Sequence, residues 1–312
     1  MKSCSDEEFL AAWDEHKSPA KLSEIFRTDV RNIYRRRRSM EIKYGLKLST
    51  DQPKAIIQKH AAKIDVNVED GVVIVFSDAH FWDVVPTTAY RALIKFIKDL
   101  KPQLVVNNGD AFDGANISRH GRIGFMEDRP SVIQELNACK EMLYGIAKAA
   151  KGATLTWPLG NHDSRFETFL AAQAPQYEFV HGFHLKDHFP EWIPCWATWV
   201  NGSTVIKHRW KGGIHATHNN TVNSGMTIVT GHLHSLKVTP FSDYNGTRYG
   251  VDTGTLADVH GSQFINYTET NPTNWRSGFA VLTFNRGILL PPELVHVLSE
   301  NEVCFRGKIY EV

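Results

Sequence analysis

The sequence has few cysteines and no long apolar run. Its 312 residues include four cysteines, none of them paired at CxxC spacing. This usage excludes a disulfide framework and predicts free thiols in a reducing compartment. No stretch approaches the ~20 apolar residues that a transmembrane helix needs, and no apolar segment of signal-peptide length follows the first methionine. We therefore expect a cytoplasmic protein with no membrane partner.

The chain also has almost no net charge, because 35 Lys and Arg stand against 34 Asp and Glu. The charge is unevenly spread, however. Residues 17–47 contain ten Lys and Arg and three acids, a net charge of +7, so the remainder is mildly acidic. A basic segment near one end indicates contact with a polyanion, and we expect nucleic acid as a partner.

The N-terminal segment predicts three short helices. Capping signals at Ser5 and at Ser18-Pro19 begin the first two. The third is predicted from near Thr28 to Tyr44. A short helix, a turn and a basic third helix resemble the helix-turn-helix modules that bind DNA.

Three arginines share one face of the third predicted helix, at spacings i, i+4 and i+7. They are Arg31, Arg35 and Arg38, which we predict to bind DNA. The alternative is a solvated, arginine-rich helical cap that touches no nucleic acid. We divide the chain into a helix-turn-helix-like module at 1–48, a linker at 49–65 and a larger domain at 66–312.

In the larger domain, strand-like and helical runs alternate. Val66 and Val68 alternate with polar residues before Asp70-Gly71, which predicts a hairpin turn into the β-branched run 72–76. Amphipathic helical patterns follow after Pro86 and after Ser131. This alternation predicts an α/β sheet with helices on its faces.

Five apolar runs each end in side chains that can bind a metal. Asp78 and His80 follow 72–76, Asp110 and Asp113 follow 104–106, Asn161, His162 and Asp163 follow 153–159, His208 follows 204–207, and His232 and His234 follow 226–230. Ligand sites in open α/β sheets lie beyond the carboxyl ends of the strands, so these clusters should converge on one crevice. Asp and neutral His suit Mn²⁺, Fe or Zn²⁺. The glycines before the ligands, at 109, 160 and 231, are expected to permit sharp turns.

The motifs are Asp-x-His, Gly-Asp-x-x-Asp, Gly-Asn-His-Asp, a single His and Gly-His-x-His, in that order over about residues 66 to 256. They resemble those of the calcineurin-like metallophosphoesterases. The resemblance implies a four-layer α/β/β/α sandwich, preceded here by the small all-α helix-turn-helix-like module. It also implies two divalent metal ions, with Mn²⁺ favoured and Fe, Zn²⁺ or Ni²⁺ as alternatives. One would be held by Asp78, His80, Asp110 and His234, and the other by Asp110, Asn161, His208 and His232.

The resemblance further implies in-line attack on phosphorus by a hydroxide that bridges the two metals. His162 would donate a proton to the leaving oxygen, and Asp163 would fix its ring. Arg165 is a candidate phosphate contact. His208 departs from the family pattern because Arg209 follows it where a glycine is usual. His215 and His218 lie nearby as alternatives, although only His208 directly ends a strand.

The leading hypothesis is a DNA-directed phosphodiesterase or nuclease, resembling phosphoesterases of bacteriophages and mobile elements and acting in the host cytoplasm if phage-encoded. One alternative is a phosphatase or phosphodiesterase for a small phosphoester or nucleotide. A more distant one is a DNA-binding regulator without catalysis. The sequence leaves a homo-oligomer open.

Overall fold

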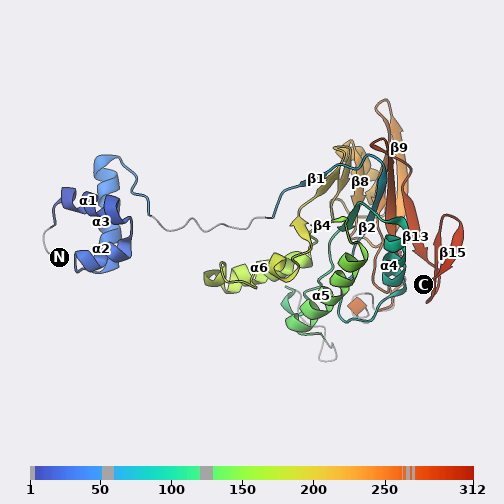
Figure 1. The fold of residues 1–312 in the computed structure, drawn as a ribbon, viewed down its shortest axis with the longest axis horizontal. Coiled ribbons are helices and arrows are strands. Elements are labelled where there is room, and N and C mark those ends of the chain that lie inside the picture. The colour runs from blue at the N-terminus through green and yellow to red at the C-terminus, as the bar shows by residue number, and fades with distance from the viewer. Residues whose placement is uncertain (1–3, 51–59, 120–128, 262, 265–267, 269–270) are drawn as a thin grey trace. The chain divides into compact units, whose positions relative to one another are not determined.

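The computed structural model describes residues 4–50, 60–119, 129–261, 263–264, 268 and 271–312. The chain divides into two compact units, Met1–Lys59 and His60–Val312 (Figure 1). Most of the predicted linker lies outside the described residues. The domain boundaries from the sequence stay predictions.

The N-terminal unit contains three helices: α1 (Asp6–His16), α2 (Pro19–Ile25) and α3 (Val30–Tyr44). The Ser5 capping box begins α1, and Ser18 caps α2. Asp29, one residue beyond the predicted start, caps α3. The core consists of buried side chains from all three helices: Phe9, Trp13, Leu22, Ile33 and Met40. Its likeness to helix-turn-helix modules stays a prediction.

The second unit contains two β-sheets. The larger has the order β15-β14-β13-β11-β2-β3-β4-β5, with β12 paired to β11. Its parallel strands are β2 (Gly71–Phe76), β3 (Leu104–Asn107), β4 (Thr154–Pro158) and β5 (Ile193–Cys195). Its remaining strands are β11 (Gly278–Asn285), β12 (Ile288–Leu289), β13 (Glu293–Val297), β14 (Glu302–Phe305) and β15 (Lys308–Glu311).

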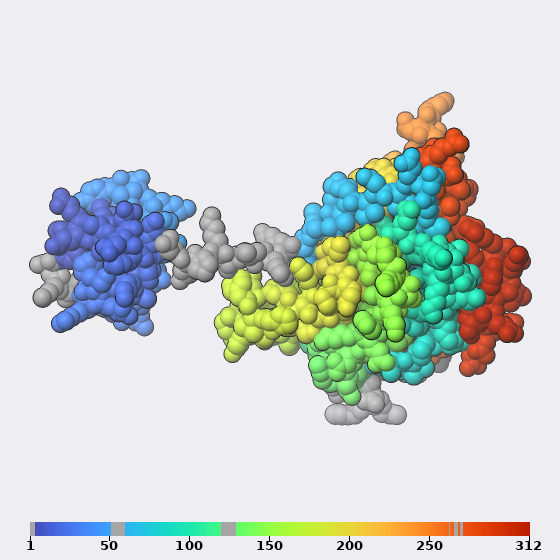
Figure 2. Space-filling model, viewed as in Figure 1, coloured from blue at the N-terminus to red at the C-terminus, as the bar shows by residue number. Residues whose placement is uncertain are grey.

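The smaller sheet has the order β1-β6-β7-β8-β10-β9. Its strands are β1 (Ile64–Val66), β6 (Thr198–Val200), β7 (Thr204–Ile206), β8 (Thr227–Thr230), β9 (Lys237–Asp243) and β10 (Gly246–Asp252). The hairpin formed by β9 and β10 projects from the surface (orange, Figure 2).

Helices cover the outer faces of both sheets. Buried valines of β2 and β3 meet Ile206 and Val229 of the smaller sheet in a core between the sheets. On the other face of the larger sheet, α4 (Thr88–Leu100) and α5 (Val132–Ala149) pack through residues such as Leu93 and Leu143. Helix α8 (Ala216–Ser224) packs against β8, β9 and β10. The predicted four-layer α/β/β/α sandwich is confirmed.

The connections contain α6 (Asp163–Gln173), α7 (Leu185–His188) and two short 3₁₀ helices, Ala115–Ile117 and Pro175–Tyr177. None of the helices in the described ranges is both long and apolar enough to cross a membrane. All four cysteines are free.

The hairpin predicted at Asp70-Gly71 is wrong. Strand β1 pairs in parallel with β6, whereas β2 belongs to the other sheet. Between them, Val68 is buried and its backbone is held by Asn201, whose side chain accepts from Val68 N at 2.8 Å and donates to Val68 O at 2.7 Å. The chain therefore crosses from one sheet to the other here, and local turn chemistry alone cannot reveal such a partner.

Candidate active site

The loops that follow β2 and β3 run side by side. The backbone N–H of Asp78 donates to Gly109 O at 2.8 Å, and that of His80 donates to Asp110 O at 3.0 Å. A loop of the smaller sheet joins them, because the N–H of His232 donates to Asp78 Oδ2 at 2.9 Å. The predicted convergence of strand ends thus brings polar side chains of both sheets together.

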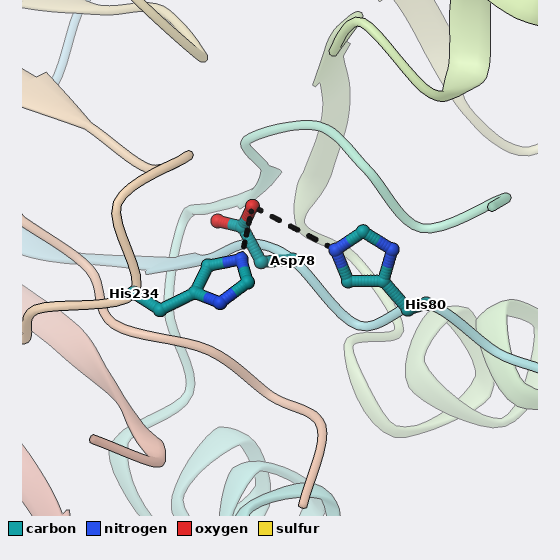
Figure 3. Close-up of side chains that lie close together, drawn as sticks. All are labelled: Asp78, His80 and His234. Atoms are coloured by element: carbon teal, nitrogen blue, oxygen red, sulfur yellow. Dashed lines mark hydrogen bonds and ion pairs between the residues drawn. The ribbon is translucent and has the colours of Figure 1, made fainter. Parts of the chain in front are cut away.

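The first group of candidate ligands consists of Asp78, His80 and His234 (Figure 3). His234 Nε2 lies 3.1 Å from Asp78 Oδ1, and His80 Nε2 lies 4.0 Å from the same oxygen. All three side chains are buried. These are carboxylate and imidazole atoms at a spacing that a single cation can bridge.

The second group consists of Asp110, His208 and His232. His208 Nδ1 lies 2.7 Å from Asn108 O, so this nitrogen carries the proton and Nε2 faces Asp110 Oδ2 at 3.0 Å. His232 is exposed, and its ring lies 5.3 Å from that of His208.

The two other histidines weighed from the sequence lie elsewhere. His215 precedes α8 as its N-cap, and His218 packs against Phe241 with 5.7 Å between ring centroids. Of these histidines, His208 is the one that groups with Asp110. An Arg in place of the usual glycine at 209 therefore does not displace this imidazole.

Four buried atoms of the candidate ligands have no hydrogen-bond partner within the described ranges: His80 Nε2, Asn161 Oδ1, His208 Nε2 and His234 Nδ1. The His208 nitrogen is close to Asp110 but poorly aligned with it for a hydrogen bond. A buried polar atom without a partner costs about 1–3 kcal/mol. Divalent cations would use these lone pairs, so the residues present fit bound metal ions.

The backbone is strained at five of the candidate ligands. Asp78, His80, Asp110, His232 and His234 have φ values of 54°, 43°, 55°, 72° and 55°. Such left-handed conformations cost about 1–3 kcal/mol each at non-glycine residues, although Asp and His tolerate them better than most. Concentrated strain of this kind marks functional sites, because the fold stabilises elsewhere what the site costs.

Two of the glycines before the ligands serve a purpose other than the predicted sharp turns. A Cβ on Gly160 would lie 1.9 Å from Asp110 Oδ1, and one on Gly231 would lie 2.6 Å from Asp78 Oδ2. At these positions the absent side chain makes room for a carboxylate. Gly109, with a φ of 89°, does adopt a conformation that favours glycine.

Carboxylates and imidazoles in the site shift one another's pKa values. Burial opposes ionisation of Asp78, but His234 and His208 outweigh it and lower the pKa of Asp78 to about 2. Burial likewise opposes the charged form of His208, yet Asp110 and Asp78 raise its pKa to about 10. The carboxylates therefore stay ionised and attract positive charge, from protons or from metal ions.

Asp113, rather than Asp163, orients the ring of His162. Asp113 Oδ1 lies 2.6 Å from His162 Nδ1 and 2.9 Å from His80 Nδ1, and its other oxygen accepts from Trp82 Nε1 at 3.2 Å. The role predicted for Asp163 is wrong in this respect. Asp113 is the second aspartate of the Gly-Asp-x-x-Asp motif, so its presence in that motif was the available signal.

Asp163 instead ties two loops together from a buried position. Its oxygens accept from five N–H groups, those of Asp110, Ala111, Phe112, Gly160 and the Trp157 indole, at 2.8–3.1 Å. Burial, followed by the charge of Asp110, raises the pKa of Asp163 to about 6. The five donors oppose that shift by stabilising the carboxylate. Asp163 is one residue beyond His162 and holds the turn that presents it.

Arg165 lies beside His162. One of its guanidinium nitrogens donates to Asp113 O at 2.9 Å, and the other lies 3.3 Å from His162 Nε2. It is therefore within the site, and its contact with substrate stays a prediction. Arg31, Arg35 and Arg38 belong to the N-terminal unit.

Asp163→Asn is expected to lower the free energy of unfolding of the second unit by about 3 kcal/mol, because an amide NH₂ would face N–H donors in a buried cluster. Asp113→Asn is the matched control: it should cost about 1 kcal/mol, since Asp113 accepts from side chains that can rearrange. Urea unfolding followed by circular dichroism measures both. Equal losses would contradict the structural role of Asp163.

Comparison of the sequence with known proteins identifies a matching family and two phage relatives. The family model described as calcineurin-like phosphoesterase matches residues 71–252, more than half of the chain. The Gene 54 protein of Mycobacterium phage L5 is 25% identical over 244 residues, which cover 71% of this chain and 92% of that protein. The Gene 54 protein of Mycobacterium phage D29 is 25% identical over 245 residues, with the same coverage.

Solved structures show a more distant likeness. Vps29 from Entamoeba histolytica, in complex with Zn²⁺, is 13% identical with a TM-score of 0.38, and the match covers 77% of this chain and 98% of that one. The E. coli phosphoesterase Yfce is 13% identical with a TM-score of 0.33, over 71% and 97% of the two chains. The family match and the geometry described above lead to one conclusion: the chain belongs to the calcineurin-like phosphoesterase family and is a metal-dependent phosphoesterase.

Proposed function

We propose that the protein is a two-metal phosphodiesterase that acts on DNA. The observation that carries the two metal ions is the pair of ligand groups that lie in one site, Asp78 with His80 and His234, and Asp110 with His208 and His232. Asp78, His80, Asp110 and His234 would hold one metal ion, and Asp110, Asn161, His208 and His232 would hold the other. When bound, two divalent cations would lower the pKa of a shared water and stabilise charge on the phosphate. The oxygen and nitrogen donors suit Mn²⁺ first, with Fe, Zn²⁺ or Ni²⁺ as alternatives.

His162 is the proposed proton donor to the leaving oxygen. Burial alone would lower the pKa of His162, but the carboxylates of Asp110 and Asp113 raise it above its ordinary value. Its Nδ1 faces Asp113, so Nε2 is the nitrogen that faces the site, 3.9 Å from Asp110 Oδ2. An imidazolium in this position can protonate a departing alkoxide. Arg165, next to the same nitrogen, can turn to a phosphate oxygen.

The arginines of α3 fall into two sets, one packed on the aromatic core and one exposed, and the exposed set supports DNA as the substrate. Arg36 and Arg37 stabilise the N-terminal unit: their guanidinium carbons lie 5.1 Å from the ring centroids of Phe9 and Trp13, respectively. Arg31, Arg35 and Arg38 are exposed, and no carboxylate pairs with them in the described part of the chain. Unpaired arginines on one helix face are suited to phosphate contacts.

The cellular setting is part of the proposal. Unpaired cysteines and the similarity to phage proteins support action in the cytoplasm of a host cell.

Cleavage of labelled DNA is the direct test. Purified full-length protein with Mn²⁺ is expected to cut DNA, and Asp110→Asn should reduce the rate by at least ~10³-fold, because a carboxylate shared by both ligand sets is lost. Hydrolysis of bis-p-nitrophenyl phosphate, measured in parallel, reports on the centre itself. Turnover of that ester with no cleavage of single- or double-stranded DNA would overturn the DNA assignment and favour a small phosphoester or nucleotide.

A triple variant of the predicted DNA-binding arginines, Arg31→Gln with Arg35→Gln and Arg38→Gln, should bind DNA more weakly. The slope of log Kd against log salt should fall by about 3, roughly one for each lost phosphate contact. The control variant combines Lys21→Gln, Arg27→Gln and Lys47→Gln, which removes the same charge from other exposed positions of this unit. Fluorescence anisotropy over a range of salt concentrations measures both variants. Equal losses would show that net charge, rather than this face, drives binding.

A further inference from the structure

A long part of the second unit contains no carboxylate side chain. Residues 192–242 include no Asp or Glu, but contain Lys207, Arg209, Lys211 and Lys237. This segment runs from β5 into β9, ending one residue before Asp243, and supplies three of the candidate ligands, His208, His232 and His234. One side of the metal centre is therefore built from chain that carries positive charge only, which favours the approach of a polyanion.

The cations concentrate in the loop that follows β7. The buried His208 is followed by three exposed residues, Arg209, Trp210 and Lys211. The exposed fraction of Trp210 is 46%. Lys207 Nζ lies 6.0 Å from the centroid of the Trp210 ring. Within the described ranges, Lys207, Arg209 and Lys211 form no ion pair with a carboxylate. The Trp210 indole is therefore exposed beside cations that no carboxylate of the described residues neutralises.

The loop is held in place at both sides of these residues. Asn108 Nδ2 donates to Lys207 O at 3.2 Å, and Lys211 N donates to Asn220 Oδ1 at 3.1 Å. Asn108 also accepts from the ring of His208, so one asparagine fixes both the ligand and the start of the loop. The side chains at 209–211 are thus presented from a fixed backbone.

This loop lies on the accessible side of the centre. The rings of Phe264 and Trp275 pack against His234, with centroids 5.7 Å and 4.6 Å away, and His234 is buried. By contrast His232, in the second ligand group, is exposed, and so is Arg209, which directly follows the ligand His208. A substrate can therefore reach the metal ligands from the side of His232 and Arg209.

We propose that this basic-aromatic loop, Lys207–Lys211, binds the strand being cut, with Arg209 and Lys211 on phosphates beside the scissile one and Trp210 stacked on an unpaired base. The inference rests on the proposed action on DNA and deepens it by naming single-stranded nucleic acid as the preferred substrate. Lysine and arginine neutralise phosphates without reading sequence. A base can stack on an aromatic ring only when it is free of the duplex stack.

The chain geometry limits which base can be involved. Consecutive Cα atoms lie 3.8 Å apart, so the Cα of Trp210 is within about 7.6 Å of that of the ligand His208. A base on the indole must then belong to a nucleotide close to the scissile phosphate. The loop would accordingly affect how a short oligonucleotide is bound, and longer DNA contacts would be left to other surfaces.

The test compares two substrates in the full-length protein with Mn²⁺. The measured quantity is the ratio of kcat/KM for a short single-stranded oligonucleotide to kcat/KM for bis-p-nitrophenyl phosphate, which has no base. Trp210→Ala is expected to lower this ratio about tenfold, and Trp210→Phe should retain most of it, because a phenyl ring still stacks. The matched control is Tyr244→Ala, which removes a fully exposed aromatic side chain at the tip of the β9–β10 hairpin and should leave the ratio unchanged.

The charged residues have their own comparison. Arg209→Ala combined with Lys211→Ala should weaken the salt dependence of KM for the oligonucleotide by about two units of slope. Lys101→Ala combined with Lys151→Ala removes the same charge after the C-terminal ends of α4 and α5, and should leave that slope unchanged.

The outcomes separate the two proposals. An unchanged ratio in Trp210→Ala, or a fall equal to that in Tyr244→Ala, would overturn the role of the loop while DNA cleavage by the unaltered protein stands. Faster cleavage of duplex than of single-stranded DNA by the unaltered protein would also overturn it. Absence of any DNA cleavage by the unaltered protein would instead refute the proposed function on which the inference rests.

Discussion

The rest of this structure depends on one constraint: the negative charge of two buried carboxylates must be neutralised by positive charge close by. Asp78 and Asp110 are almost completely buried where the two sheets meet, and burial of unpaired carboxylates is costly. Histidines that follow strands of the smaller sheet offset that cost by facing them at about 3 Å, as His234 faces Asp78 and His208 faces Asp110. Since the same imidazoles have buried nitrogens without a partner among the described residues, metal cations bound between them would complete the neutralisation of the carboxylates.

Residues around the candidate ligands hold this arrangement. Asp163 accepts from four backbone N–H groups of two loops and from the indole of Trp157 in β4, whereas Asp113 joins His80 to His162. The first therefore maintains the turns that carry the ligands, and the second couples a ligand to the proposed acid. Strained backbone at the ligands themselves is compatible with a stable fold because these outer contacts, and the core between the sheets, stabilise it.

Much of this could be predicted from the sequence, since periodicity and motif order are local features. The β-branched run at 72–76 forms β2, the capping boxes at Ser5 and Ser131 are present, and the family's four layers follow from its motifs. The polar residues after the strands do meet. Convergence could be predicted because parallel strands place their carboxyl ends at one edge of a sheet.

What could not be predicted depends on contacts between distant segments. The pairing of β1 with β6 joins residues more than a hundred positions apart. The turn signal at Asp70-Gly71 could not reveal it, so the hairpin predicted there is wrong. Asp163 is predicted as the partner of His162 because it is the next residue, whereas the fold brings Asp113, 49 residues earlier, to the imidazole ring. The need for glycine at 160 arises from a carboxylate fifty residues earlier. Similarly, five arginines in α3 look alike until Arg36 and Arg37 pack on the aromatic core.

The N-terminal unit and the loop after β7 would divide the recognition of DNA between them. In this account the arginines of α3 bind the duplex or strand as a whole, and Arg209 to Lys211 bind close to the phosphate that is cut. Both surfaces contain exposed cations that no carboxylate of the described residues pairs with, and Trp210 adds an exposed aromatic ring to the second. All of this presupposes a metal centre between the sheets.

Metal stoichiometry therefore tests the central claim most directly. Equilibrium dialysis of the full-length protein against Mn²⁺, with electron paramagnetic resonance of the bound ions, counts the ions and shows whether they are magnetically coupled. The account predicts two Mn²⁺ per chain with a coupled spectrum, as expected for ions about 3.5–4 Å apart, and fewer in His208→Ala. A single uncoupled ion, or two ions that persist unchanged in His208→Ala, would contradict it.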